Sequence, residues 1–354
     1  MEKIVICGGH HNSALPLAKR FKEADHQVIF VGHKTTQKNN RELSSEYKEV
    51  TGHSFLFVNL VAPKFYKNRN PLKYLLLMFS LVDAFVILVK YRPKLVLSYG
   101  GYLAVPICLI AKLIGIKIAT HEQTVTLGMA NRLIAKIANK VFLSWPLSIS
   151  LGEKYCYVGL PLREEILSIT PRKNYSEFKT LFITGGKQAS HIFNEFVFNN
   201  IEKLTSEFRI IHQTAKNSQN NDYQISQSLM EKYGKEKYIA FDYCYGEEYQ
   251  KVLNESDFLL SRSGAHITYE MAYLKIPAIL VPIPWVSQNE QMLNAQTAKS
   301  YFPSIILDEK DLSVENFLDA VAKLQKITHQ KKSYKLVPTD AGENMFEIIK
   351  KDLL

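Results

Sequence analysis

The sequence predicts an α/β protein with two doubly wound domains, each built on a parallel sheet. Short apolar runs alternate with helical patterns along the chain, which is the order typical of parallel sheets covered by helices. Glycine pairs follow several of the apolar runs, and the same order restarts after Pro161. The chain has 354 residues, enough for two domains with full cores, so we favour two sheets over one very wide sheet.

The first domain begins with the apolar run Ile4–Cys7, which we expect to be a strand. Gly8 and Gly9 then form a turn, and a helical pattern covers Ser13–Glu23. Further strands are predicted at Gln27–Val31, Leu95–Ser98 and Lys117–Thr120, with a helix over Leu103–Ile114.

The second domain repeats this arrangement from Leu181–Thr184, which leads into a glycine pair and a helix over Ser190–Leu204. Later strands are predicted at Phe208–His212, Tyr238–Phe241, Phe258–Ser261 and Ala278–Val281. We therefore assign residues 1–158 to the first domain and 159–338 to the second. Residues 339–354 should form a helix that can cross back onto the first domain.

Open α/β sheets bind ligands beyond the carboxyl ends of their strands, and the glycine turns of this chain lie at such ends. Two facing domains would bring these turns to one cleft. The Gly8-Gly9 turn lacks the third glycine of a GxGxxG fingerprint, so a nicotinamide cofactor is not indicated.

The segment from Asp257 to Gln291 has the pattern of an anion site. A strand, a turn of small residues and a helix start would point backbone N–H groups at a ligand. Glu270 falls one to two turns into that helix, where its carboxylate would repel a diphosphate but accept hydrogen bonds from ribose hydroxyls. A nucleotide-diphosphate pocket is favoured, and an ordinary βαβ unit is the alternative.

The net charge of +10 suits an anionic partner such as a phosphorylated substrate or an anionic lipid. The lysines are dispersed and no nucleic-acid module is recognisable, so no nucleic-acid partner is expected. The cysteines have no CxxC spacing, and the first residues do not resemble a secretory leader, so we expect a reducing cytoplasm and no zinc site. These cysteines are Cys7, Cys108, Cys156 and Cys244.

The most apolar segment, Leu72–Val89, has three interpretations. It can be a helix lying partly on a membrane surface, a buried core helix, or a membrane-spanning helix. Asp83 at its centre disfavours a span, because a carboxylate there costs about 2.5–3.5 kcal/mol on insertion scales. Flanking lysines would attract an anionic leaflet if apolar side chains were exposed.

Four blocks, in consistent order, resemble the MurG family of bacterial peptidoglycan glycosyltransferases, which add N-acetylglucosamine to lipid I. They are the GGY…HEQ block (Gly100–Tyr102 with His121–Gln123), GLPLR (Gly159–Arg163), GGKQ continuing to Asn194 (Gly185–Asn194), and RSGA with Glu270, Glu290-Gln291 and Asn294-Ala295 (Arg262–Ala295). The resemblance runs from the N-terminus to about Ala298.

The resemblance implies a GT-B glycosyltransferase, with two Rossmann-like domains facing across a cleft. It implies a UDP-N-acetylglucosamine donor on the C-terminal domain and an undecaprenyl-diphosphate-linked muramyl acceptor on the N-terminal domain. The product would be lipid II, formed with inversion at the anomeric carbon and without a bound metal. The enzyme would be a peripheral protein on the cytoplasmic face of the cell membrane.

The resemblance also implies site residues. His11 or His10 would be the general base; the loop is shorter than the family's, so both stay candidates, and we favour His11. Arg163 would neutralise the diphosphate, Glu270 would bind the ribose, and Gln291 beside Glu290 would contact the sugar. The donor side is expected to comprise Arg163, Gly185, Gly186, Lys187, Gln188, Ser263, Gly264, Ala265, Glu270, Glu290 and Gln291, and the acceptor side Gly9, Tyr102, Gln123, Thr124 and Asn194.

Departures from the family pattern concern the acceptor more than the donor. The first loop has lost the family's Gly-Thr-Gly spacing, and Thr124 replaces an asparagine. Lys187 replaces a serine but can add a charge contact to phosphate. A transferase with another lipid-linked or cell-wall acceptor, a non-catalytic nucleotide-sugar-binding subunit and a sugar-nucleotide epimerase are therefore the alternatives.

Overall fold

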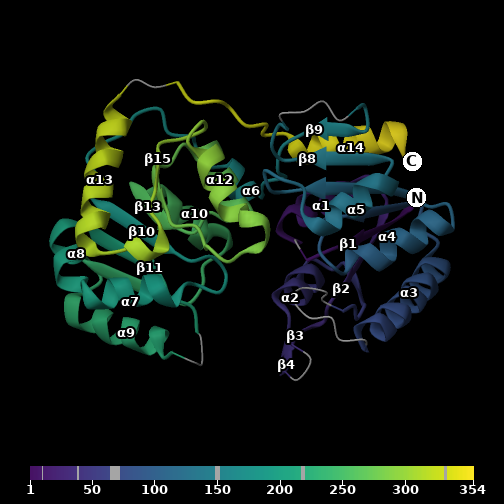
Figure 1. The fold of residues 1–354 in the computed structure, drawn as a ribbon, viewed down its shortest axis with the longest axis horizontal. Helices are drawn as coiled ribbons and strands as arrows, with labels where there is room; N and C mark the ends of the chain where they lie inside the picture. Colours follow the sequence, from purple (N-terminus) through teal and green to yellow (C-terminus); the bar gives the residue numbers. More distant parts are fainter. Residues whose placement is uncertain (10, 38–39, 64–71, 148–151, 217–219, 331–332) are drawn as a thin grey trace. The chain divides into compact units, whose positions relative to one another are not determined.

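The computed structural model describes residues 1–9, 11–37, 40–63, 72–147, 152–216, 220–330 and 333–354 (Figure 1). The chain forms two compact units, Met1–Arg163 with Pro338–Leu354, and Glu164–Val337. The division falls after Arg163, five residues later than the boundary we placed from the sequence, and the C-terminal segment belongs to the first unit. The fold class is the one predicted, since each unit holds a parallel sheet covered by helices.

The first unit contains a seven-stranded parallel sheet in the order β5-β2-β1-β6-β7-β8-β9. In sequence order these strands are β1 (Lys3–Cys7), β2 (Gln27–Gly32), β5 (Leu56–Asn59), β6 (Leu95–Ser98), β7 (Lys117–Glu122), β8 (Lys140–Leu143) and β9 (Tyr155–Tyr157). A small antiparallel pair, β3 (Thr35–Gln37) and β4 (Asn40–Leu43), lies outside it. The helices are α1 (His11–Glu23), α2 (Ser45–Gly52), α3 (Leu72–Tyr91), α4 (Ala104–Leu113), α5 (Met129–Ile137) and α14 (Ala341–Asp352).

Alternate residues of the central strands pack on opposite helix layers, because side chains of a strand alternate between the two faces of the sheet. Ile4 and Ile6 face a core shared with α1 and α14. Val5 and Cys7 face a second core shared with α3, α4 and α5. The strands are buried on both sides, which explains why they read as continuous apolar runs rather than alternating ones.

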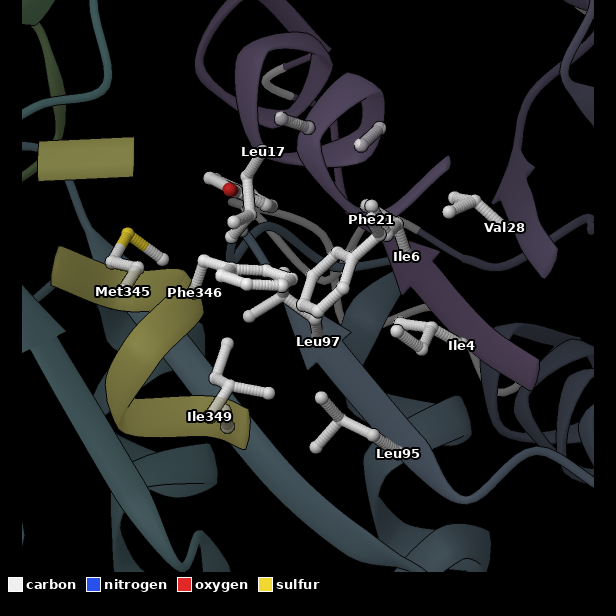
Figure 2. Packing of buried hydrophobic residues seen from close by; sticks show 14 of the residues in the cluster. Ile4, Ile6, Leu17, Phe21, Val28, Leu95, Leu97, Met345, Phe346 and Ile349 are labelled. Atoms are coloured by element: carbon white, nitrogen blue, oxygen red, sulfur yellow. The ribbon is translucent and has the colours of Figure 1, made fainter. Parts of the chain in front are cut away.

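The C-terminal helix α14 completes the first of these cores (Figure 2). Its Phe346 ring packs against Phe21 of α1, with the ring centroids 5.3 Å apart. Two ion pairs fasten the same helix at its ends: Arg20 Nε lies 2.7 Å from Glu343, and Lys140 Nζ lies 2.7 Å from Asp352. Helix α14 therefore stabilises the fold of the first unit.

The second unit contains a six-stranded parallel sheet in the order β12-β11-β10-β13-β14-β15. Its strands are β10 (Thr180–Thr184), β11 (Arg209–Gln213), β12 (Tyr238–Phe241), β13 (Phe258–Ser261), β14 (Ala278–Leu280) and β15 (Ser304–Ile306). The helices are α6 (Glu164–Leu167), α7 (His191–Asn199), α8 (Ile201–Glu207), α9 (Asp222–Tyr233), α10 (Gly246–Glu255), α11 (Ala265–Leu274), α12 (Glu290–Ala298) and α13 (Val314–His329), with 3₁₀ turns η1 (Ser287–Asn289) and η2 (Glu309–Asp311).

The single helix predicted over Ser190–Leu204 is two helices, α7 and α8, divided at Asn200. The Asn200 side chain donates to the carbonyl of Phe196 at 2.8 Å, so it caps the end of α7 rather than continuing it. Both helices still bury apolar side chains, including Phe193, Val197 and Leu204, in the same core.

Helix α3 exposes an apolar stripe along its length. Its buried side, with Ala84 and Leu88, packs against the sheet of the first unit. Its outer side carries six apolar residues that are between 43% and 61% exposed, at the spacing of one helical face: Met78, Phe79, Val82, Phe85, Val86 and Val89. A wholly buried core helix is therefore the wrong interpretation. Among the described residues, no helix is long and apolar enough to cross a membrane.

His212 makes the second unit sensitive to acid. Its ring is fully buried in β11, Nδ1 lies 2.9 Å from the Tyr238 hydroxyl, and burial lowers the pKa of His212 from 6.5 to about 3. The unfolded chain binds a proton below pH 6.5 while the folded chain does not, so stability falls as the pH drops from 6.5 towards 3. We expect His212 alone to contribute a slope of about 1.4 kcal/mol per pH unit in the free energy of unfolding.

Urea unfolding of the wild type and of His212→Gln at pH 7, 6 and 5 measures this contribution. The wild type should lose stability more steeply than the variant as the pH falls. Parallel slopes for the two proteins would contradict a neutral buried His212 in the folded state.

Candidate active site

Several of the predicted site residues lie in loops at the points where the strand order of each sheet reverses. In the first unit, β1 lies between β2 and β6, and the loops after β1 and β6 leave from neighbouring carboxyl ends. In the second unit, β10 lies between β11 and β13, and the loops after β10, β13 and β14 leave the same edge. Such reversal points are where open α/β sheets bind ligands, because the flanking connections diverge there.

The first loop is shaped by a close approach between two backbones. Gly8 has a φ of +114°, and a Cβ there would lie 2.5 Å from the carbonyl oxygen of Gly100. Only glycine fits this contact, which joins the turn after β1 to the turn after β6. Gly9 is exposed beside it, whereas His10 lies outside the described residues.

His11 is the first residue of α1 and is only 6% exposed. Its Nε2 lies 2.8 Å from Oε2 of Glu49 on α2, 38 residues further along the chain. The structure thus places the His11 ring in the interior, within hydrogen-bond distance of a partly exposed carboxylate. Glu49 was not among the predicted site residues.

The tyrosine and glutamine expected on the acceptor side differ in exposure. The half-buried Tyr102 ring lies 5.9 Å from the His33 ring, and burial, then the Glu46 charge, raise the pKa of Tyr102. Gln123 is buried. Thr124 is half-buried, and its hydroxyl donates to the carbonyl of Thr126 at 2.6 Å.

Glu122 organises the loop that carries Gln123 and Thr124. Its Oε1 accepts from the Thr124 backbone N–H at 3.0 Å, and its Oε2 accepts from the Gly128 N–H at 2.8 Å and from Asn131 Nδ2 at 2.9 Å. His121 is fully buried with Nε2 3.0 Å from the carbonyl oxygen of Gly159. The histidine and glutamate of the HEQ block therefore stabilise the loop that carries Gln123 and Thr124.

The loop after β10 carries exposed donor-site candidates. Gly186, Lys187 and Gln188 are exposed, and the loop ends at Ser190, the residue before α7. The Gly186 carbonyl accepts from Gln213 Nε2 at 2.7 Å, which ties the loop to the end of β11. An ammonium group at Lys187 and a helix start leave this loop suited to an anion.

The loop after β13 is bound tightly to the segment after β14. The Ser263 hydroxyl donates to the carbonyl of Gln291 at 2.8 Å, and Asn294 Nδ2 donates to the carbonyl of Ser263 at 3.1 Å. The Gln291 side-chain oxygen accepts from the N–H of Ile283 at 3.0 Å. The Gln291 amide expected to contact the donor sugar thus also orders its own loop, beside the half-buried Glu290.

Glu270 is the sixth residue of α11, a helix that begins at Ala265 with Gly264 as its N-cap. The carboxylate is 4% exposed, and the Tyr249 hydroxyl donates to its Oε2 at 2.8 Å. Tyr249 lies on α10 and was not foreseen. The hydrogen bond from Tyr249 fixes the position of the buried carboxylate. A carboxylate fixed in this way can accept a further hydrogen bond from a donor such as a ribose hydroxyl.

Arg262 links the two glycine-bearing loops of the second unit. Its Nη2 donates to the Ser190 hydroxyl at 2.9 Å and lies 2.5 Å from Oε2 of Glu309. The guanidinium also lies over the Phe193 ring, 4.6 Å from the centroid. Burial lowers the pKa of Arg262, and the Glu309 carboxylate opposes that shift. The arginine is therefore a brace between the loops and is not turned towards solvent.

Two further predicted residues lie apart from these loops. Asn194 is 1% exposed, and its Nδ2 donates to the Thr214 carbonyl at 3.2 Å and to Asp222 at 2.6 Å, so it lies inside the second unit instead of lining the acceptor side. Arg163 is half-buried at the last position of the first unit's main segment.

The comparison with known families agrees with this geometry. The glycosyltransferase family 28 N-terminal domain matches residues 7–143, and the family's C-terminal domain matches residues 180–351. The chain belongs to glycosyltransferase family 28. The N-terminal match lies within the first unit, whereas the C-terminal match covers most of the second unit and continues into the C-terminal segment of the first. Each match contains one of the strand-order reversals described above.

Relatives of this family 28 chain cover its whole length. It is 29% identical to a Clostridium kluyveri protein named UDP-N-acetylglucosamine–N-acetylmuramyl-(pentapeptide) pyrophosphoryl-undecaprenol N-acetylglucosamine transferase, over 99% of both chains. The crystal structure of Acinetobacter baumannii MurG matches 99% of this chain and 100% of its own, at 19% identity and a TM-score of 0.70. A UDP-GlcNAc 2-epimerase from Neisseria meningitidis matches at 12% identity and a TM-score of 0.61, covering 99% of this chain and 100% of its own. The structural matches establish the GT-B fold that was predicted.

Proposed function

We propose that this family 28 enzyme transfers N-acetylglucosamine from UDP-N-acetylglucosamine to lipid I, producing lipid II. The observation that carries the proposal is that the loops after β10, β13 and β14 leave one edge of the sheet, with the buried Glu270 in the helix that follows β13. A diphosphate fits the glycine loop with Lys187, and a ribose fits the carboxylate. Relatives named for this reaction over the full chain length support the choice of donor and acceptor.

In the proposed reaction, the acceptor hydroxyl oxygen attacks the anomeric carbon of the donor sugar. The bond from that carbon to the diphosphate oxygen breaks, UDP leaves, and the hydroxyl proton passes to a base. His11, or His10 beside it, is the base candidate, since an imidazole has a pKa near neutrality. Arg163, Lys187 and the start of α11 stabilise the charge on the leaving diphosphate. We propose that these groups replace a metal ion in that role.

We further propose that the first unit docks on an anionic membrane surface, at the cytoplasmic face, through the exposed stripe of α3. The neighbouring helix α4 ends with the exposed Leu113, and exposed Lys90 and Lys112 lie at the ends of the two helices. Exposed apolar side chains surrounded by lysines bind anionic bilayers in two ways. The apolar side chains bury their surface in the bilayer, and each lysine near the surface contributes about 1 kcal/mol of electrostatic attraction.

Replacing both Phe79 and Phe85 by glutamine should weaken binding to vesicles of phosphatidylcholine with phosphatidylglycerol by about 100-fold or more, because each buried phenyl ring contributes about 1.5–3 kcal/mol. Leu336→Gln is the matched control, since Leu336 is 82% exposed but lies on the second unit. Cosedimentation of each protein with the vesicles measures the effect. Equal binding of the double variant and the wild type would exclude α3 as the docking surface.

The decisive test is release of UDP from UDP-N-acetylglucosamine with and without a lipid I analogue. The wild type should release UDP only with the acceptor. His11→Ala and His10→Ala, made separately, identify the base, whose loss should lower turnover by about 100-fold or more. Donor binding without release on any lipid I analogue would refute this acceptor and favour another cell-wall acceptor or a non-catalytic subunit. Turnover of the donor alone would indicate an epimerase.

A further inference from the structure

One buried arginine connects four segments of the second unit. Arg262 directly follows β13, and its side chain is 8% exposed. Its Nη1 donates to the carbonyl of Val281, which follows β14, at 3.2 Å. Its Nη2 donates to the Ser190 hydroxyl at 2.9 Å, and the same nitrogen lies 2.5 Å from Oε2 of Glu309 in η2, after β15. The guanidinium therefore joins the ends of three neighbouring strands to the residue before α7.

The charge of this arginine is balanced by Glu309. A cation removed from water needs a compensating charge and hydrogen bonds, because burial alone disfavours the charged form. Within the described part of the chain, Glu309 is the carboxylate that pairs with the guanidinium, and its side chain is 15% exposed. The Phe193 ring adds only a weaker cation–π attraction. Without Glu309, the guanidinium would be drawn towards water and away from Ser190.

Ser190 is the point at which this arrangement reaches the donor loop, residues 185–189. The N–H of Ala189 donates to the carbonyl of Gly186 at 2.9 Å, so the loop is a tight turn that ends at the buried Ser190. Lys187 lies within this turn and is exposed. A displacement of Ser190 would therefore move the backbone and the ammonium group that are expected to meet the diphosphate.

We propose that Glu309 is a positioning residue for donor binding. By pairing with Arg262 it holds Ser190, and with it the loop after β10, in the position that receives the diphosphate of the donor. The inference rests on the proposed transferase function, because it takes this loop as the diphosphate site. It extends the donor site to a residue that belongs to none of the sequence blocks described above.

Isothermal titration of the full-length protein with UDP and with uridine tests the positioning role. Glu309→Ala should weaken UDP binding by about tenfold, because the loop is no longer held. It should leave uridine binding unchanged, because uridine has no diphosphate. Glu309→Gln should recover part of the UDP affinity, since its amide oxygen can still accept from Arg262. Glu315→Ala, which removes an exposed carboxylate from the next helix, α13, is the matched control and should bind both ligands as the wild type does.

Two further variants separate positioning from a loss of folding. Glu309→Ala leaves a buried cation unpaired and should lower the melting temperature, whereas Arg262→Met combined with Glu309→Leu removes both charges and should restore it. This double variant should still bind UDP about tenfold more weakly than the wild type, because nothing then holds Ser190. Ser190→Ala should cause a similar loss, and adding Glu309→Gln to Ser190→Ala should weaken UDP binding no further.

Three outcomes would overturn the inference. The first is wild-type affinity for UDP in the double variant, and the second is an equal loss of UDP and uridine binding in Glu309→Ala. The third is additivity of Ser190→Ala and Glu309→Gln, because the two side chains would then act independently. Absence of UDP binding in the wild type is a different result, since it would refute the proposed function on which the inference rests.

Discussion

Replacing Glu270 by alanine is expected to weaken UDP binding by about 100-fold, because hydrogen bonds from ribose hydroxyls to a carboxylate each contribute about 1.5–3 kcal/mol. The effect should be large because the carboxylate is buried and already fixed by Tyr249 at 2.8 Å. Isothermal titration with UDP measures it.

The ligand supplies the control for this prediction. UDP and its 2′-deoxy analogue should bind the wild type with clearly different affinities and should bind Glu270→Ala with nearly the same affinity. Tyr249→Phe removes the hydroxyl that holds the carboxylate. Its preference for UDP over the 2′-deoxy analogue should be smaller than that of the wild type and larger than that of Glu270→Ala. If Glu270→Ala still discriminates as the wild type does, the ribose lies elsewhere.

Replacing Gly185 by alanine is expected to disrupt the donor loop as a whole. A Cβ at this position would lie 2.3 Å from the carbonyl carbon of Ala189 and 2.4 Å from the N of Ser190. Both contacts are with backbone atoms, so no side-chain rotation relieves them and the start of α7 has to move. We expect a loss of about 3 kcal/mol in the free energy of unfolding and a loss of donor binding of at least about tenfold.

Gly264→Ala is the matched control for stability, because a Cβ there meets nothing within 4 Å and the φ of Gly264 is −64°. Thermal unfolding of both variants should separate them, with only Gly185→Ala strongly destabilised. Equal melting temperatures would show that the loop after β10 accommodates the extra methyl group.

The sequence predicted the strands that are continuous apolar runs and the glycine turns after them, since both signals are local. It missed β3, β4, β5, β8, β9 and β15, which have only three or four residues each. It also left the role of Leu72–Val89 undecided, because composition cannot tell which side of a helix packs on the sheet. The exposed stripe of α3 became visible only once Ala84 and Leu88 were seen in the core.

Site residues were predicted where strand, turn and helix are consecutive in the sequence. Site residues were missed where segments distant in the sequence come into contact. Glu270 and the glycine loops could be named because strand, turn and helix follow one another in the sequence. Their partners could not: Glu49 lies 38 residues from His11, and Tyr249 lies 21 residues from Glu270. Nothing in the local pattern around a surface glutamate or a helix tyrosine indicates such a partner.

Helix α14 gives the chain an unusual order of assembly during synthesis. The second unit is one continuous segment, Glu164–Val337, and has all its parts once the ribosome has released it. The first unit emerges earlier but lacks Met345, Phe346 and Ile349 of its core until α14 has been synthesised. Its nascent form must therefore wait, with an apolar face of α1 uncovered, while the later segment matures first. A chain truncated before α14 would keep that face uncovered and become a substrate for chaperones or proteases.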